Sequence, residues 1–539
     1  MSRVLVLDDD PEQVALTRLM LKSAGHEVLT APDTRSAAAQ AFEGAPDVLL
    51  MDLNVPRASD GRGLIRDLKA RGFKGRIVVF SGWPEELYGT PEAQAVERIL
   101  PKPVAMATLM AAVRKLAVVL CCVGPVFAQT FAFQVSRQIE IVAEMEMASP
   151  GADWSQAGRE AALAELRVDG GAPQHVMLFA GAERHTYRAF LGRLAPGSHE
   201  LRIARNAKYS AAGAGLEVTS VRFREDDSPE LAHAPILYAR ADTVGGFSDV
   251  PLAAYCERLT GGGRPLVEYT VIFSNEDGGT STRALMARWG RTTDIEYIYR
   301  VWLGPDGAVR RATIQTRDHK EVEFRGRREG AHPVLIPVTR NNMVAPGGAS
   351  PIRYQLPPVA VDLSAHSREQ VMDEHPVLYR VMAQELAREG KLRAAGKPEG
   401  ENISDPRHYL YLEAKVANRR SAVAAAVRLE GERVWRTGHL GRADYAISRD
   451  GWVRTAIELP PGAPPVAELG FECLVPPSKS QPALFGTCRV EAVSRVFPLG
   501  PDYRPGPDLW RLAQPFELPT GQMRVWPVGG RASNPLSAP

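Results

Sequence analysis

The chain has 539 residues, too many for one compact core, so length alone predicts about three or four domains. Its 45% hydrophobic and 24% charged residues are ordinary globular values and exclude a chain that is disordered from end to end. With 65 lysines and arginines against 63 aspartates and glutamates, the net charge of +2 gives no case for a nucleic-acid or membrane-surface protein.

Residues 1–118 alternate short apolar runs with helix-like segments, a pattern typical of a parallel sheet with crossover helices. The predicted strands are Val4–Leu7, Glu27–Ala31, Val48–Met51, Ile77–Phe80 and Arg98–Leu100. The clearest helix runs from Pro11 to Ala24, where Asp10 is placed to cap the first turn. We therefore expect an α/β domain with five parallel strands.

Polar side chains follow four of these strands. They are Asp8, Asp9 and Asp10 after the first, Asp52 after the third, Ser81 at the end of the fourth and Lys102 after the fifth. Because the carboxyl ends of parallel strands meet at one edge, we expect Asp8, Asp9 and Asp52 to lie together. Clustered carboxylates repel unless a cation neutralises them, and oxygen ligands without His or Cys favour Mg²⁺. The backbone carbonyl of Asn54 is a further expected ligand.

This combination predicts phosphoryl chemistry at Asp52. Its carboxylate can attack a phosphoryl donor in line, while the metal and Lys102 neutralise the equatorial oxygens and Ser81 donates a hydrogen bond. Each residue also has a structural explanation: Asp8 to Asp10 as a helix cap, Asp52 as a strand-end carboxylate and Lys102 as part of a solvated turn. Their joint position at the ends of the correct strands favours the phosphoacceptor.

These residues resemble the receiver domain of two-component response regulators. The shared motifs are Val4–Pro11, Asp47–Pro56, Asp60-Gly61, Val79–Gly82 and Leu100–Pro103. The resemblance implies a flavodoxin-like (βα)5 doubly wound fold with strand order 2-1-3-4-5, Mg²⁺ dependence, and phosphorylation of Asp52 by a sensor histidine kinase or phosphotransfer protein. It implies metal-site roles for Asp8 and Asp9, a switch hydroxyl on Ser81 and phosphate binding by Lys102. Such a domain is a phosphoacceptor that catalyses its own phosphoryl transfer rather than a conventional enzyme.

The apolar junction at residues 119–133 resembles a secretory signal peptide. Arg114 and Lys115 form a basic start, an apolar stretch follows, and Val126-x-Ala128 precedes Gln129. Three interpretations stay open: a fusion of two reading frames, a transmembrane helix over residues 116–135, or an apolar helix end followed by a buried strand. The receiver is expected in the cytoplasm, the C-terminal part is exported if the junction acts as a signal peptide, and membrane contact is expected only through residues 116–135.

From Phe131 onward, short alternating runs broken by Gly, Pro and Asp-Gly turns predict mainly β modules. The expected units are a β-sandwich-like module at 134–224, a β-rich module at 231–340, a β-rich module with one helix at 359–528 and a disordered tail at 529–539. The helix is expected from Pro376 to Glu389, and Tyr409–Val416 alternates as a strand with one buried face. Cys473 and Cys488 form a disulfide if this part is exported or remain buried thiols, while Cys256 stays unpaired.

The role of this second part is left open by its motifs. Glu276, Asp277, Asp294 and Glu296 fit a calcium site or an acid/base pair acting on a sugar. A hairpin with an Asp-Gly turn and surface ion pairs to Arg288 and Arg291 is the favoured explanation, because such pairs are common on any surface. No helix-turn-helix pattern follows the receiver, so no nucleic-acid partner is expected. The sequence predicts a phosphorelay response regulator with a β-rich region of unknown role. The competing hypothesis is an exported β-rich binding or carbohydrate-active protein, with a glycan ligand, fused by accident to a receiver domain.

Overall fold

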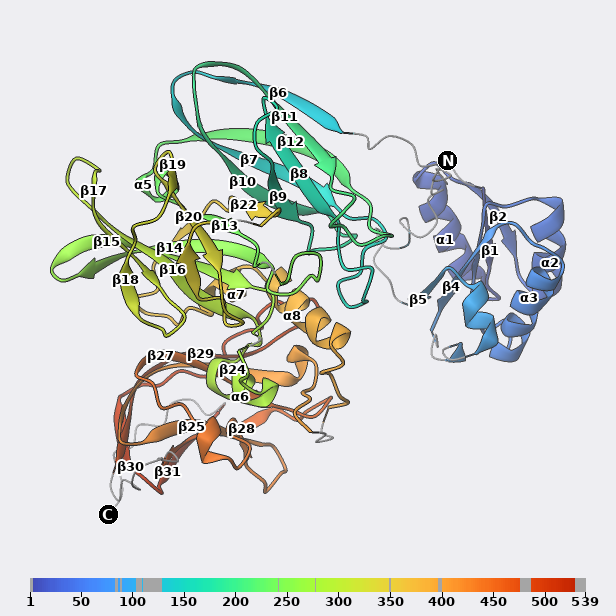
Figure 1. Ribbon diagram of the computed structural model, residues 1–539. Helices are drawn as coiled ribbons and strands as arrows, with labels where there is room; N and C mark the ends of the chain where they lie inside the picture. The colour runs from blue at the N-terminus through green and yellow to red at the C-terminus, as the bar shows by residue number, and fades with distance from the viewer. Residues whose placement is uncertain are drawn as a thin grey trace. The chain divides into compact units, whose positions relative to one another are not determined.

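The computed structural model describes residues 3–82, 86–87, 90–102, 109, 128–240, 242–276, 278–348, 350–395, 400–475 and 486–528. The chain divides into two compact units, Met1–Pro125 and Val126–Pro539 (Figure 1). Most of residues 103–127 and the whole of 529–539 lie outside the described residues. This applies to the end of the predicted receiver, to most of the predicted signal-peptide-like junction and to the predicted tail.

The first unit is a five-stranded parallel sheet flanked by helices (Figure 1). Its elements are β1 (Arg3–Leu7), α1 (Pro11–Ser23), β2 (Glu27–Ala31), α2 (Thr34–Glu43), β3 (Val48–Met51), α3 (Ala58–Ala70), β4 (Arg76–Ser81), a 3₁₀ turn η2 (Pro91–Ala95) and β5 (Arg98–Pro101). The sheet order β2-β1-β3-β4-β5 confirms the predicted 2-1-3-4-5 order. Asp10 caps α1 as expected, because its side chain accepts from the backbone N–H groups of Glu12 and Gln13.

The central strands of this sheet are buried on both faces. On one face, Leu5, Leu49 and Met51 pack with residues of α2 and α3, and on the other, Val6 and Leu50 belong to a separate cluster that includes α1. Helices on both faces explain why these strands are continuous apolar runs rather than alternating ones. The carboxyl edge of the sheet is left as the place where polar side chains collect.

The second unit consists mostly of β sheets with few helices, and its first seven strands form two sheets. The strands are β6 (Gln129–Val135), β7 (Ile139–Ala148), β8 (Leu163–Val168), β9 (Gln174–Met177), β10 (His185–Leu194), β11 (Gly197–Arg205) and β12 (Glu217–Asp226). The sheet orders are β10-β7-β12 and β6-β11-β8-β9, and both sheets contribute side chains to one core cluster. β6 begins at Gln129, within the range expected for the junction. Asp169 and Gly170 have positive φ angles of 49° and 70°, as the predicted Asp-Gly turn requires.

The middle of this unit holds a six-stranded sheet, β18-β17-β16-β15-β14-β23, and a smaller sheet built around β20 and β13. The elements are α5 (Pro229–Ala232), β13 (Ile236–Tyr238), β14 (Pro251–Gly261), β15 (Arg264–Phe273), α6 (Thr282–Trp289), β16 (Asp294–Leu303), β17 (Val309–Gln315), β18 (Glu321–Glu323), β19 (Arg328–Glu329), β20 (His332–Pro337), β21 (Val344–Pro346), β22 (Arg353–Tyr354) and β23 (Val359–Val361). Cys256 of β14 is buried and unpaired, as predicted.

The last part combines two helices with two four-stranded sheets, β27-β24-β29-β30 and β26-β25-β28-β31. Its elements are α7 (Gln370–Glu374), α8 (Val377–Arg388), η3 (Pro406–His408), β24 (Tyr409–Arg419), β25 (Ala422–Leu429), β26 (Arg436–Thr437), η4 (Ala443–Tyr445), β27 (Gly451–Glu458), β28 (Val466–Leu474), β29 (Thr487–Pro498), β30 (Phe516–Pro519) and β31 (Met523–Pro527). α8 matches the predicted helix. A disulfide between Cys473 and Cys488 joins β28 to β29 and therefore links the two sheets.

No helix in the part of the chain that the structure describes is long and apolar enough to cross a membrane. The predicted span over residues 116–135 lies mostly outside that part, and its described end, from Gln129, is the strand β6.

Candidate functional site

The carboxyl edge of the first sheet brings together four of the predicted site residues. Asp8 follows β1, Asp52 follows β3 and Lys102 follows β5. The Lys102 ammonium donates to Oδ2 of Asp8 at 2.6 Å and to Oδ2 of Asp52 at 2.7 Å. One cation therefore bridges two carboxylates that come from different strands.

The other oxygen of Asp52 is held by two further donors. Ser81, at the end of β4 and fully buried, donates its hydroxyl to Oδ1 at 2.6 Å, and the backbone N–H of Asn54 donates to the same oxygen at 3.1 Å. Oδ1 of Asp8 accepts from the backbone N–H of Asp10 at 3.0 Å. These contacts fix the orientation of both carboxylates at the sheet edge.

Asp9 and Asn54 are placed differently from the other predicted residues. Asp9 is exposed, and its carboxylate makes no hydrogen bond or ion pair to residues that the structure describes. Asn54 is half-buried and reaches Asp52 through its backbone N–H, so its peptide lies beside the carboxylate. Asp9 therefore remains available to an added ligand, whereas the Asp8 and Asp52 oxygens already have partners.

The protonation of Lys102 follows from these neighbours. Burial alone would lower the pKa of its ammonium, but the hydrogen bonds to Asp52 and Asp8 and their negative charges outweigh this effect, so the pKa is raised. Lys102 remains charged at neutral pH. It partly offsets the repulsion between the two carboxylates, which the sequence had led us to expect a metal to neutralise.

The donor set fits a magnesium ion in its chemistry. Asp8, Asp9, Asp52 and the Asn54 carbonyl offer oxygen ligands alone, as Mg²⁺ prefers. Within the described ranges, no group of three or more His, Cys, Asp or Glu side chains is arranged as a ligand set, and the Lys102 ammonium lies between the Asp8 and Asp52 carboxylates instead.

A close approach between α3 and the loop after β3 supports the position of Asp52. A Cβ atom on Gly61 would lie 2.1 Å from the carbonyl oxygen of Leu53, the residue that follows Asp52. Only glycine allows this contact without a backbone shift. The Asp60-Gly61 motif thus helps to pack α3 directly onto the phosphoacceptor loop.

Comparison with known proteins agrees with this geometry. The family model described as "Response regulator receiver domain" matches residues 4–114. Protein PilH of Pseudomonas aeruginosa is 31% identical over 114 residues, which are 20% of this chain and 93% of PilH. The chain belongs to the response regulator receiver family.

Other relatives of this receiver domain match over the same region. Transcriptional regulatory protein PrrA of Mycobacterium tuberculosis is 34% identical over 116 residues, which are 21% of this chain and 49% of PrrA, so the match spans about half the length of that relative. The solved structure of response regulator protein TrrA from Thermotoga maritima, in complex with Mg(2+)-BeF, is 22% identical and covers 21% of this chain and 95% of that chain, with a TM-score of 0.19. The region outside the receiver domain has no part in these matches.

Of the carboxylates singled out in the second unit, Asp294 is buried and Glu276 and Glu296 are half-buried. Asp294 begins β16 and is fully buried, and its Oδ2 accepts from the amide of Asn342 at 3.0 Å. Burial, together with the charges of Glu296 and Glu276, raises the pKa of Asp294 well above its ordinary value. Asp277 lies outside the described residues. Among the residues described, these carboxylates are not arranged as metal ligands.

The two arginines expected to pair with these carboxylates have other partners. Arg291 is buried and its guanidinium lies 3.1 Å from Glu369, and Arg288 donates to the backbone carbonyl of Asp444. The interpretation of this stretch as a surface hairpin with ion pairs to Arg288 and Arg291 is therefore wrong. The reason is that Glu369 and Asp444, which are far away in the sequence, contact these arginines instead.

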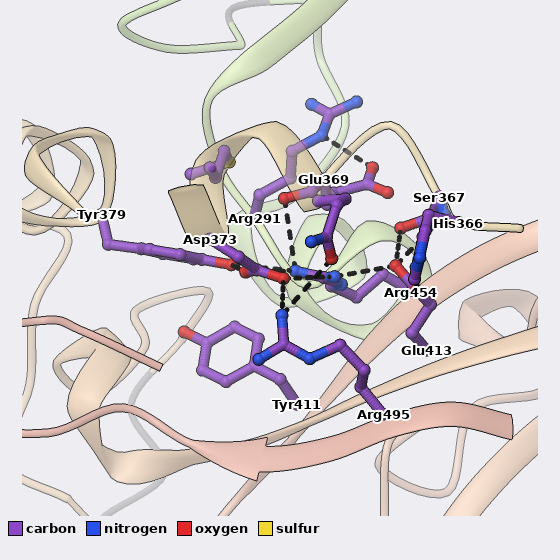
Figure 2. A network of polar contacts seen from close by, with 12 residues as sticks. Arg291, His366, Ser367, Glu369, Asp373, Tyr379, Tyr411, Glu413, Arg454 and Arg495 are labelled. Carbon is purple, nitrogen blue, oxygen red and sulfur yellow. Dashed lines mark hydrogen bonds and ion pairs between the residues drawn. The ribbon is translucent and has the colours of Figure 1, made fainter. Parts of the chain in front are cut away.

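A buried charge network in the second unit was missed by sequence reasoning (Figure 2). Arg454 of β27 is fully buried, donates to both carboxylate oxygens of Asp373 at 2.7 and 2.8 Å, and donates to Glu413 at 2.8 Å. Arg495 of β29 donates to Asp373 at 2.7 Å, and the Tyr379 hydroxyl donates to the same residue at 2.6 Å. The network ties α7 and α8 to the sheet of β24, β27 and β29.

Glu413 lies at the other end of this network. Burial would raise the pKa of its carboxyl, but the charge of Arg454 and hydrogen bonds from Ser367, Ser494 and His366 outweigh that effect and lower the pKa to about 2. Both oxygens of Glu413 have protein partners. We interpret the network as a structural contact that holds the helices against the sheet. Its sequence signals are the charged residues Arg454 and Glu413 in the middle of the mostly apolar strands β27 and β24.

Proposed function

We propose that this chain acts in a two-component phosphorelay and receives a phosphoryl group on Asp52. The donor is a sensor histidine kinase or a phosphotransfer protein, and the reaction depends on Mg²⁺. The observation that carries the proposal is the Asp52 carboxylate held between Lys102 and Ser81 at the carboxyl edge of the sheet. That edge is where open α/β sheets bind their ligands.

The proposed roles follow from the contacts. An oxygen of Asp52 attacks the phosphorus, the bond between phosphorus and the donor's imidazole nitrogen breaks, and the imidazole leaves with its electron pair. The Lys102 ammonium moves from neutralising the two carboxylates to neutralising a phosphoryl oxygen, and the Ser81 hydroxyl turns to donate to another. Asp8, Asp9, Asp52 and the Asn54 carbonyl hold Mg²⁺, which supplies positive charge beside the phosphoryl group when bound.

The experiment is phosphorylation of the intact chain by acetyl phosphate, followed by intact mass. We expect one added phosphoryl group with Mg²⁺ present, little with EDTA and none in Asp52→Asn. Asp67→Asn is the matched control, because Asp67 is an exposed aspartate of the same unit that pairs with Arg71. Absence of labelling, or equal labelling of Asp52→Asn, contradicts the proposal.

For the division of the chain into domains, we propose a receiver at 1–118, a junction at 119–133, a β-sandwich-like module at 134–224, and β-rich modules at 231–340 and 359–528. The β modules form the output region of the protein, which does not bind DNA. The shared core of the two sheets from β6 to β12 supports the sandwich. The receiver acts in the cytoplasm, where its phosphodonors are.

One observation favours the competing hypothesis of an exported β-rich binding or carbohydrate-active protein. The disulfide between Cys473 and Cys488 is of the kind that persists in oxidising compartments rather than in the cytoplasm. Cell fractionation followed by N-terminal sequencing of the product that carries the last module tests it. An exported product beginning at Gln129 supports export, and a cytoplasmic product that includes the receiver contradicts it. Retention on a panel of polysaccharides tests for the glycan ligand.

A further inference from the structure

The second unit contains a cavity of about 240 Å³ that none of the roles above uses. Its lining comes from β9, β10 and β14, from the segment after β22 and from the start of α8. The walls are aliphatic and aromatic and include Met177, Phe179, Leu252, Tyr354, Leu356 and Leu378. The volume lies just below the range of roughly 300–1,000 Å³ typical of small-molecule sites. An apolar body of modest size therefore fits it.

Two imidazoles line this otherwise apolar cavity. His185 of β10 packs its ring against Phe179 and Tyr187, with centroids 5.6 and 4.9 Å apart, and His375 precedes α8. Neither ring makes a hydrogen bond or ion pair with any residue in the described part of the chain. Burial, with the positive charge of Arg380, lowers the pKa of His185 to about 4, and burial also lowers the pKa of His375. Both rings are therefore neutral at pH 7, and each retains one N–H donor.

Arg188 supplies the charge at this site. It is the one charged side chain among the described lining residues, and no carboxylate lines the cavity. Its Nε lies 3.2 Å from Glu144, while its two terminal nitrogens have no hydrogen-bonding partner among the described residues. The nearby Glu146 accepts from the Thr186 hydroxyl instead. The charge of Arg188 acts on both imidazoles, because it helps to lower the pKa of His185 and of His375. A guanidinium near two imidazole N–H donors is complementary to a carboxylate.

We propose that this cavity binds a small carboxylate with an apolar chain, such as a medium-chain carboxylic acid in its ionised form. Arg188 and the imidazoles of His185 and His375 hold the head group, and the aromatic and aliphatic walls cover the chain. The second unit is then a ligand-binding module in its own right. This inference is independent of phosphorylation at Asp52, because the cavity lies entirely within the second unit.

Isothermal titration of the full chain with decanoate, below its micelle concentration, tests the proposal. We expect saturable binding at one site per chain, and affinity for decanoate at least about tenfold above that for decylammonium. Labelled methionine methyl groups report the location, because Met177 lines the cavity and its resonance is identified by its loss in Met177→Leu. No saturable binding by the folded chain, or equal affinity for the two head groups, overturns the proposal.

Two variants separate the head-group site from the cavity. Arg188→Gln should weaken decanoate binding about tenfold or more and leave the thermal midpoint unchanged, since the Arg188 side chain is 49% exposed. Ala253→Trp should fill the cavity and abolish binding of both probes. Arg202→Gln, an exposed arginine of β11 outside the cavity, is the matched control. Undiminished decanoate binding by folded Arg188→Gln overturns the assignment even if Ala253→Trp fails to fold.

Discussion

At the scale of single residues, Lys102 matters because it serves two carboxylates at once. The side chains of Lys102, Asp8 and Asp52 are 19%, 9% and 14% exposed, so solvent screens their charges only in part. Removal of the ammonium leaves the buried Asp8 carboxylate and the half-buried Asp52 carboxylate with no positive charge between them. The same removal frees oxygen atoms for a metal ion. Substitution of Lys102 should therefore change both the stability of the first unit and its response to Mg²⁺.

We predict that Lys102→Met destabilises the first unit by about 1–2 kcal/mol without Mg²⁺, and that added Mg²⁺ raises its unfolding midpoint more than in the wild type. Calorimetry of the intact chain, with EDTA or with MgCl₂, measures both effects. Lys69→Met is the control, because Lys69 is exposed in the last turn of α3. Equal midpoint shifts by Mg²⁺ in wild type and Lys102→Met would show that the Lys102 ammonium does not compete with the metal ion for these carboxylates.

Glu385 of α8 provides a pH-dependent contribution to stability. Its buried carboxyl accepts from the indole N–H of Trp154 at 2.5 Å and pairs with Arg388, but burial dominates and raises its pKa from 4.5 to about 8. The folded state thus binds a proton more tightly than the unfolded state. The resulting stabilisation is complete below pH 4.5 and is lost as the pH rises through about 8.

We expect the unfolding free energy of the second unit to fall between pH 5 and pH 8.5 and to fall less in Glu385→Gln. Urea titrations of the intact chain at a series of pH values measure this slope. Glu200→Gln, at an exposed position of β11 far from Glu385 in the sequence, should keep the wild-type slope. If Glu385→Gln keeps it too, the proton is bound elsewhere.

At the scale of elements, α3 offers a matched pair of glycines. Gly61 packs against Leu53 so closely that a methyl group would lie 2.1 Å from a carbonyl oxygen, whereas nothing lies within 4 Å of the corresponding position on Gly63. We predict that Gly61→Ala costs about 1–3 kcal/mol and slows labelling of Asp52, because α3 must move away from the phosphoacceptor loop. Gly63→Ala should instead stabilise the unit by about 0.5–1 kcal/mol. Chemical denaturation and acetyl phosphate labelling check both, and a harmless Gly61→Ala would show that the contact does not position the loop.

The buried network makes β27 dependent on α7 and β24. Because Arg454 is fully buried, Arg454→Met leaves Asp373 and Glu413 without their shared cation, and we predict a loss of about 3–5 kcal/mol from the second unit. Arg495→Met should cost less, since its side chain is 19% exposed. Denaturant titration measures both, with the exposed Arg524→Met of β31 as reference. Equal losses of unfolding free energy in Arg454→Met and Arg524→Met would show that the buried network does not hold these elements together.

The elements themselves differ in how far the sequence predicts them. The five strands of the first unit lie where expected because each is a short, mostly apolar run, and the site residues are local to the strand ends. In β24, the alternation predicts one buried face, but Tyr411 and Glu413 on the opposite face are buried as well. The reason is that β24 lies in the middle of its sheet and the α7 segment covers that face. The partners of Glu413 are 41 to 81 residues away in sequence, so no local pattern reveals them.

At the scale of the whole molecule, the two units differ in what holds them together. The first unit has a two-sided apolar sheet, whereas the second joins several sheets through shared apolar clusters, to which buried ion pairs and one disulfide are added. The receiver could be predicted because its chemistry repeats a family pattern in about 118 residues. The cavity and the network could not, because each is assembled from segments scattered between residues 176 and 495.

The disulfide gives a prediction that separates the two units. Cys473 and Cys488 close a loop with a sequence separation of 15, for which chain entropy alone predicts about 3 kcal/mol of stabilisation. Reduction should therefore lower the unfolding free energy of the second unit by that amount. It should leave the unfolding transition of the first unit and the labelling of Asp52 unchanged. Calorimetry with and without reductant, together with alkylation to count free thiols, tests this, and buried Cys256 should react only after unfolding. If reduction also changes labelling of Asp52, the sheets linked by the disulfide influence the receiver, and the account of an accidental fusion fails.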